Sequence, residues 1–295
     1  MADFTAKKSD LYDRQIRLWG SESQNLLQSS KVLFLRPVGC VTECLKNTVL
    51  SGIQVTIAPM SAADGLYANN VVAEVKQLNP YGNVESVDTM SIEDTVIEGH
   101  TLVVAYCTDL EELSKLSARC EAAKISLIGA CQFGFRACSF VQLHSPSGPH
   151  TYKREIGKDK LSDPVTTHYP PLAAILNTKD WTTLKDRWGP VKHELVAWNL
   201  ITCYDVKNSD LASFKIHAAS KLASLELSSS FSDSELEELH QSQNSPTIFP
   251  VSAVFGGLMG QEVIKSLSRK GDCANNILYF DGEKAGTVRY PPIPK

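Results

Sequence analysis

The loop 36–41 follows a short apolar run and has the place of a phosphate-binding loop. Such a loop needs several glycines, so that backbone N–H groups can approach phosphate, and a carboxylate after the next strand to bind ribose. Gly39 is the glycine that this loop retains. Arg36 and Val41 occupy the positions where two further glycines would stand. Pro59 and Met60 occupy the end of the second expected strand, where the ribose-binding carboxylate would stand. The sequence therefore predicts a dinucleotide-type element without a nucleotide site of its own, and no cofactor on this chain.

Cysteines are the second group that could do chemistry, as nucleophiles or as zinc ligands. The chain has eight: Cys40, Cys44, Cys107, Cys120, Cys131, Cys138, Cys203 and Cys273. Their irregular spacing, mostly within apolar or small-residue runs, is typical of buried, reduced thiols. No C-x-x-C pair is present, and the histidines have no second ligand at helical spacing. We expect neither a nucleophilic cysteine nor a metal site on this chain.

The segment YDRQIRLWG (12–20) places two arginines, Arg14 and Arg17, close to Tyr12 and Trp19 before the first expected strand. The simplest interpretation is a short helix whose Ile16 and Trp19 pack on the core while the arginines are solvated. A functional interpretation needs support from the rest of the sequence.

Short apolar runs alternate with helical stretches along the first half of the chain. The expected strands are 31–35, 53–58, 102–106 and 125–129, the expected helices are 42–52 and 110–123, and 133–143 is expected to form a hairpin or final strands. This alternation predicts an α/β fold, a Rossmann-like, doubly wound and mostly parallel sheet.

The composition changes after residue 144. Prolines, three tryptophans and a Ser-rich acidic stretch lead us to expect a mostly helical excursion over 145–245, including a helix capped by Ser232 or Ser234. The chain then returns to the core with an apolar helix at 252–267, a turn near Gly271 and a strand at 277–280. We expect one domain over 1–295, with a Rossmann-like core at 12–144 and 246–295.

Composition restricts the class of protein. The chain has 295 residues, of which 43% are hydrophobic, and a formal net charge of -4. A length and apolar content of this kind allow a large core. The charge offers no basic surplus for nucleic acid, and no apolar run approaches the roughly 20 residues of a spanning helix. We expect neither a nucleic-acid nor a membrane partner, and the N-terminus does not resemble a secretory signal.

Five motifs together resemble the small, non-catalytic subunits of SUMO-activating enzymes, within the ubiquitin-activating-enzyme-like adenylation family. They are YDRQIRLWG, LKNTVLSG at 45–52, LNP at 78–80, FPVSAVFGGLMGQEVIKSLS at 249–268 and YFDGE at 279–283. The resemblance spans about 12–282 and is thin between 145 and 245. It implies an adenylation fold of the ThiF/MoeB type.

The resemblance also implies a heterodimer. The large catalytic subunit would hold ATP, magnesium, zinc and the catalytic cysteine, and SUMO would be bound through the complex. Arg14 would reach across the dimer to the partner's ATP as an arginine finger, a role that suits a planar, permanently charged guanidinium. Arg17 and the helix residues Gly256, Gly257, Gly260 and Gln261 would lie at the partner interface.

Two alternatives remain open. One is the small subunit of the enzyme that activates the cullin-modifying ubiquitin-like protein. That subunit carries a long helical insertion, for which 295 residues leave little room. The other is a non-enzymatic scaffold of the same fold. The preferred interpretation is a subunit that is inert alone and supports adenylation and thioester formation of SUMO on its partner, in the nucleus and also the cytoplasm.

Overall fold

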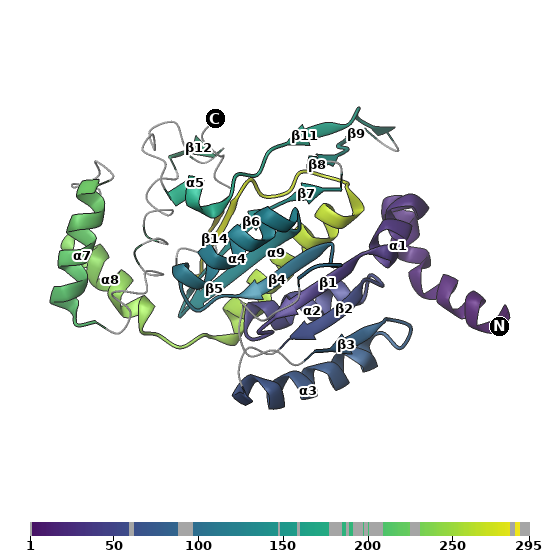
Figure 1. Cartoon of the computed structure of the whole chain (residues 1–295), viewed down its shortest axis with the longest axis horizontal. Helices are drawn as coiled ribbons and strands as arrows, with labels where there is room; N and C mark the ends of the chain where they lie inside the picture. Colours follow the sequence, from purple (N-terminus) through teal and green to yellow (C-terminus); the bar gives the residue numbers. More distant parts are fainter. Residues whose placement is uncertain are drawn as a thin grey trace.

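A computed structural model describes residues 2–58, 62–87, 97–146, 148–157, 160–176, 185–186, 189–190, 197, 200, 209–224, 231–283 and 287–289 (Figure 1). Its helices are α1 (Ala2–Ser29), α2 (Cys40–Val49), α3 (Ala62–Leu78), α4 (Leu110–Ala123), α5 (Leu172–Leu176), α7 (Leu211–Ser224), α8 (Asp233–Gln243) and α9 (Phe249–Ser268). The strands of the central sheet are β1 (Lys31–Leu35), β2 (Gln54–Ala58), β3 (Val84–Ser86), β4 (Leu102–Tyr106), β5 (Ser126–Phe133), β6 (Arg136–Gln142), β14 (Ile277–Asp281) and β15 (Thr287–Arg289).

The central sheet is mostly parallel. Within the described residues its order is β15-β14-β6-β5-β4-β1-β2-β3. Neighbouring strands in the run β5-β4-β1-β2-β3 pair in parallel. Strands β6, β14 and β15 add antiparallel pairs at one edge of the sheet. Parallel neighbours joined by crossover helices are what alternating apolar runs predict. The carboxyl ends of β1, β4 and β5 therefore meet at one edge of the sheet, where the loop 36–41 begins.

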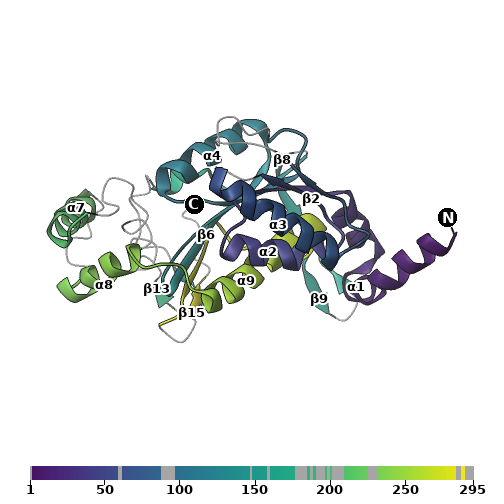
Figure 2. The same ribbon diagram turned by 90° about the horizontal axis from the view of Figure 1, so that it is seen from below.

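Two apolar cores lie on opposite faces of this sheet. Strand residues alternate between them, so Leu33 and Leu35 join one core while Val32 and Phe34 join the other. Helices α4, α5, α7 and α8 contribute to the first core, and α1, α2, α3 and α9 contribute to the second. Figure 2 shows α4 on one side of the sheet and α2, α3 and α9 on the other. The doubly wound architecture predicted from the sequence is thus observed.

The region 145–245 differs in part from its prediction. Its first part forms short strands: β7 (His144–Ser145), β8 (Gly148–Tyr152), β9 (Glu155–Gly157), β10 (Lys160–Leu161) and β11 (Val165–Thr167). The expectation of helix is wrong there, because β-branched and aromatic residues in the HTY and VTT runs favour extended backbone and prolines interrupt helices. Two further short strands follow, β12 (Lys185–Asp186) and β13 (Gly189–Pro190). The later part is helical, and Ser232 caps α8 through a capping box with Glu235, as expected.

Helices α7 and α8 lie at the end of the molecule opposite α1, as both ribbon views show (Figures 1 and 2). The strand-rich part instead packs near the end of α9. The backbone of Lys153 bonds to Arg269 and to Gly271, and the Arg154 guanidinium donates to Asp272 over 2.8 Å. The excursion therefore has two separate parts, and among its described residues it is the strand-rich part that bonds to the end of α9.

Candidate functional site

The loop 36–41 connects β1 to α2 at the carboxyl edge of the sheet. Gly39, the N-cap residue of α2, has a φ of 53°, and no side-chain hydrogen bond caps this helix. Arg36 also has a positive φ, 45°, which is uncommon for a residue with a side chain. The backbone thus keeps the sharp turn of a glycine loop, although one of its turning positions carries an arginine.

The Arg36 side chain is held by groups of its own chain. Its guanidinium Nη1 lies 2.8 Å from Glu112 Oε2 and donates to the carbonyl of Tyr106 over 3.0 Å. Both side chains of the ion pair are largely buried, at 16% and 17% exposed. The same carboxylate accepts the backbone N–H of Thr108 over 2.7 Å. Arg36 therefore faces a carboxylate at this edge of the sheet, an arrangement that disfavours a bound phosphate there.

Side chains from β4, β5 and α9 also pack around Gly39. A Cβ atom at Gly39 would lie 3.3 Å from Gln132 Oε1 and 3.7 Å from Ser252 Oγ. Ser252 donates to Gln132 over 2.9 Å, and Gln132 in turn donates to the carbonyl of Ile248 over 3.0 Å. Val41 is fully buried, and Pro59 and Met60 lie outside the described residues. The polar groups near the glycine turn thus bond to one another across β5 and α9.

Arg14 lies on the outward face of α1. Leu11, Arg14 and Leu18 share that face at helical spacing and are all exposed, the two leucines by 46% and 70%. Arg17 is exposed on a neighbouring side and pairs with Asp13 over 2.8 Å. Two exposed leucines beside an exposed arginine are compatible with a surface that meets a partner, because the core of such a surface combines apolar side chains with arginine. The structure therefore places the predicted finger where it could project out of this chain.

Helix α9 has two faces with different surroundings. A Cβ atom at Gly256 would lie 2.6 Å from the carbonyl oxygen of Cys40, and one at Gly260 would lie 3.2 Å from Asn47 Cβ. Both glycines thus allow close packing on α2 within this chain. Gly257 has no atom within 4 Å of a built Cβ, and Gln261 is exposed. Of the four predicted interface positions on α9, these two face away from α2.

The outward face of α9 is apolar from Phe249 to Gly257 and becomes polar at Gln261. Phe249 is 87% exposed and Val254 50% exposed, and the exposed Ala253 lies between them. This strip is continued by Gly257, which has open space beside it. An exposed apolar strip on one helix is a feature of protein interfaces.

The described cysteines are buried. They are Cys40, Cys44, Cys107, Cys120, Cys131, Cys138 and Cys273, and all are free thiols. Burial raises the pKa of each thiol that has a resolved shift, that of Cys120 to about 12, and so disfavours the nucleophilic thiolate. Cys203 lies outside the described residues. Within the part of the chain that the structure describes, no three metal-ligating side chains cluster.

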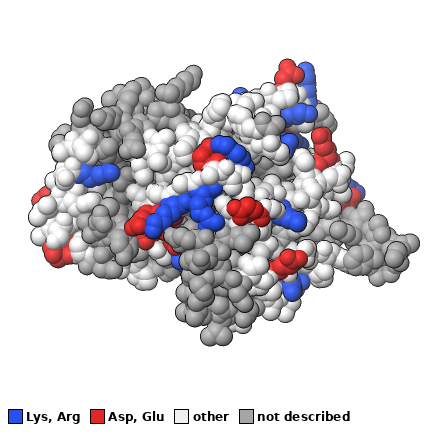
Figure 3. All heavy atoms as spheres, in the orientation of Figure 1, with Lys and Arg blue, Asp and Glu red and all other residues white. Residues whose placement is uncertain are grey.

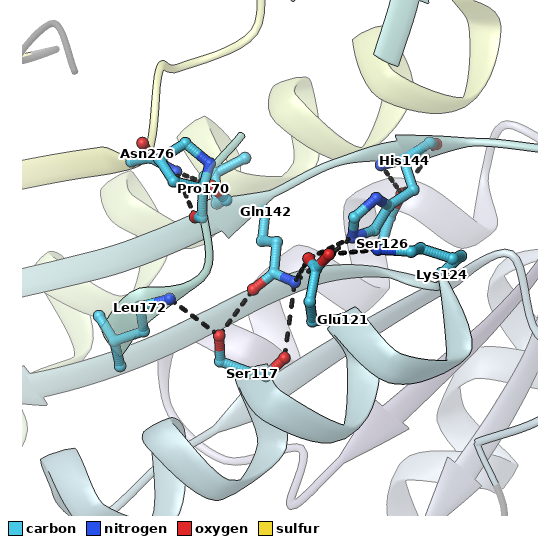
Figure 4. A network of polar contacts seen from close by, with 10 residues as sticks. Ser117, Glu121, Lys124, Ser126, Gln142, His144, Pro170, Leu172 and Asn276 are labelled. Atoms are coloured by element: carbon cyan, nitrogen blue, oxygen red, sulfur yellow. Dashed lines mark hydrogen bonds and ion pairs between the residues drawn. The ribbon is translucent and has the colours of Figure 1, made fainter. Parts of the chain in front are cut away.

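Two histidines, His144 and His150, have largely buried side chains. His150 is 2% exposed on β8, stacked on Tyr152, and burial lowers its pKa to about 4. His144 Nε2 lies 3.2 Å from Glu121 Oε2, and burial is the main cause that lowers its pKa. Figure 4 shows His144 and Glu121 in a polar network with Gln142 and Ser117. Ser117 accepts the backbone N–H of Leu172, so the network attaches the excursion to α4 and β6.

Charged side chains of both signs are interspersed on the face in Figure 3, where Lys and Arg lie beside acidic groups. A nucleic-acid surface would instead present a continuous basic stripe. None of the described helices has the length and apolar character required to cross a bilayer.

The sequence did not reveal several residues that contact the loop 36–41 or the helix that carries Arg14. Glu112 and Gln132 contact the loop 36–41 from distant parts of the chain, which no local pattern shows. Asn79 was visible only as the middle residue of the LNP motif at 78–80, without a role.

No family model matches this chain. The chain is 27% identical to SUMO-activating enzyme subunit 1 of Dictyostelium discoideum, over 95% of this chain and 92% of that protein. It is also 27% identical to the human protein of the same name, over 94% and 93%. The DNA damage tolerance protein rad31 of Schizosaccharomyces pombe is 24% identical over 95% of this chain and 96% of its own length. These relatives confirm the resemblance inferred from the motifs.

Among solved structures, E. coli MccB, crystallised with succinimide, matches with a TM-score of 0.51. The match has 12% sequence identity and covers 96% of this chain and 72% of that one. It concerns the fold alone, and it confirms the predicted α/β fold with its mostly parallel sheet.

Proposed function

We propose that this chain, a relative of SUMO-activating enzyme subunit 1, is the small, non-catalytic subunit of a heterodimeric SUMO-activating enzyme. It supports ATP-dependent adenylation of SUMO and formation of the SUMO thioester on a large partner subunit. The observation that carries this proposal is the similarity to these relatives over nearly the whole of both chains. A shared fold alone would allow many activities.

The absence of catalysis by the chain alone is part of the proposal. Arg36 faces Glu112 at the carboxyl edge of the sheet, and the groups around Gly39 bond to one another. The described thiols are buried and their resolved pKa values are raised, which disfavours thioester chemistry on them. ATP, magnesium, zinc and the reacting cysteine would therefore be supplied by the partner. The complex would act in the nucleus and also the cytoplasm.

Arg14 is the proposed catalytic residue of this chain. Its exposure between Leu11 and Leu18 supports a position at the edge of the partner, where its guanidinium could contact ATP phosphate. A guanidinium stabilises charge that develops on phosphate during nucleotidyl or phosphoryl transfer. The apolar strip of α9, with Phe249 and Val254, would add buried contact area at the same interface.

Purification of the native complex tests the proposal. Affinity capture of this chain followed by mass spectrometry should recover a large subunit with zinc-binding cysteine motifs. The reconstituted pair, incubated with ATP and SUMO, should form a reducible SUMO adduct on the large subunit only. An adduct on this chain, or a captured chain that forms no adduct with SUMO, would exclude the proposed division of roles.

A further inference from the structure

Helix α1 consists of two parts joined at Gly20, where φ is 87° and ψ is 160°. These angles are not helical, and they belong to a region that residues with side chains rarely adopt. The second part, 21–29, packs on the core through Gln24 and Leu27, which are 2% and 0% exposed. Because helical hydrogen bonds do not continue regularly through Gly20, the second part does not by itself fix the direction of the first. Side-chain contacts must set where the first part points.

The main contact is made by Tyr12 and Asn79, both 1% exposed. Asn79 Nδ2 donates to Tyr12 Oη over 2.9 Å and to the carbonyl of Val49 over 2.8 Å. Asn79 Oδ1 accepts the backbone N–H of Tyr81 over 3.1 Å. A single amide thus connects α1 to the end of α2 and to the turn after α3. A buried amide with these partners has one stable orientation.

The ring of Tyr12 is also confined by Gly52. A Cβ atom at Gly52 would lie 2.8 Å from Tyr12 Oη and 2.9 Å from Cζ, too close for any side chain. Gly52 has a φ of 86°, so the turn itself requires glycine. The absence of a side chain at Gly52 therefore leaves the space that the Tyr12 ring occupies.

Two further contacts join α1 to the same turn. Gln15 Nε2 donates to the carbonyl of Leu50 over 2.9 Å. Trp19 Nε1 donates over 2.9 Å to Gln24, whose amide donates to the carbonyl of Ser51 over 2.8 Å. Tyr12, Gln15 and Trp19 recur at helical spacing, so they form one inward face of the helix. The outward face, with Arg14, is fixed as a consequence.

We propose that Asn79, acting through Tyr12, is a positioning residue for Arg14. Residues two apart on a helix point in directions about 200° apart, so a clamped Tyr12 directs Arg14 away from the body of this chain. The inference rests on the proposed function, because Arg14 acts there on the partner's ATP. Asn79 itself touches neither ATP nor SUMO.

Hydrogen exchange on the reconstituted complex tests the clamp itself. In Asn79→Ala, and more mildly in Tyr12→Phe, amide protection across 11–19 should fall about tenfold or more, while that of 31–35 and 102–106 changes less than about twofold. Tyr152→Phe is the matched control, because it removes the hydroxyl of another buried tyrosine, one that donates to Asp272 between α9 and β14. Unchanged protection across 11–19 in both clamp variants would overturn the inference.

A double-mutant cycle tests whether the clamp acts through Arg14. SUMO-dependent ATP-pyrophosphate exchange by the complex should fall about threefold to tenfold in Asn79→Ala, but by less than about twofold when Arg14 is already alanine. A rate loss of equal size in both backgrounds would assign Asn79 a general structural role and overturn the inference. If Arg14→Ala slows exchange but Asn79→Ala and Tyr12→Phe do not, the inference fails and the proposed function stands. If Arg14→Ala leaves exchange unchanged, the proposed role of Arg14 fails, and the inference with it.

Discussion

Arg14 is the side chain for which stability and catalysis should respond most differently to mutation. It is exposed, so Arg14→Ala should change the free energy of unfolding by no more than about 0.5 kcal/mol. If it contacts the partner's ATP, exchange by the intact heterodimer should fall, by about tenfold if it shares the phosphate with other cations and by about a thousandfold if it acts alone. The measurement is the rate of ATP-pyrophosphate exchange on a dimer that gel filtration shows to be intact.

Arg14→Lys and Lys115→Ala provide the controls for that measurement. Lysine keeps the charge but lacks the planar fork, so it should restore little of the rate. Lys115 is an exposed cation on α4, on the other face of the sheet, and its loss should leave the rate unchanged. Full activity in Arg14→Ala would show that the outward face of α1 contributes contact only.

At the scale of elements, α9 offers a matched pair of glycines. Gly256→Ala should destabilise the isolated chain by about 1–3 kcal/mol, because its Cβ would lie 2.5 Å from Glu43 Cβ and 2.9 Å from the backbone nitrogen of Cys44. Gly257→Ala, with open space beside it, should stabilise the isolated chain by about 0.5–1 kcal/mol through helix propensity. Thermal unfolding of each variant measures both effects.

The same pair separates folding from association. If the outward face of α9 packs on the large subunit, Gly257→Ala should weaken the heterodimer even though it stabilises the isolated chain. Titration calorimetry with the large subunit measures this. If Gly257→Ala leaves the affinity for the large subunit unaltered, the prediction that Gly257 lies at the interface is wrong.

Strand β8 carries a titratable group that predicts a pH dependence. The pKa of His150 is lowered by burial to about 4, below the ordinary 6.5, so between these values the unfolded chain binds the proton that the folded chain does not. The contribution of His150 to the free energy of unfolding should therefore be fully present above about pH 6.5. It should decrease by roughly 2–3 kcal/mol as the pH falls to about 4. Denaturant unfolding from pH 7 to 4 measures the slope.

His150→Phe keeps an aromatic ring beside Tyr152 and removes the titrating group. The slope should become shallower in this variant, although His144, whose pKa is also lowered, still contributes in the same direction. An identical slope in the two proteins would contradict the assignment to His150.

Local patterns predicted the elements of the core and missed contacts between distant residues. The expected strand 31–35 and helix 110–123 have the observed bounds of β1 and α4, because apolar runs and amphipathic periods are local signals. The strands of 148–167 were missed, since they are short and interrupted by prolines. The partners of Arg36 and Asn79 lie 76 and 67 residues away, at Glu112 and Tyr12, and depend on how the sheet is assembled.

The whole chain is a Rossmann-like body, and we propose that it has kept its fold and lost its own nucleotide site. The isolated chain should therefore bind ATP weakly or not at all, because Arg36 pairs with Glu112 at the edge where phosphate would bind. Calorimetry with the purified chain measures this. A Kd in the low micromolar range, equivalent to about 8 kcal/mol of binding free energy, would contradict the loss of the site.

We propose that this chain completes an activity that neither subunit performs alone. The most direct measurement is SUMO-dependent ATP-pyrophosphate exchange by the large subunit, by this chain, and by the two together at equal concentration. The proposed division of roles predicts exchange by the pair and no more than background from either chain alone. Exchange by the large subunit that is equally fast without this chain, or exchange by this chain alone, would contradict it.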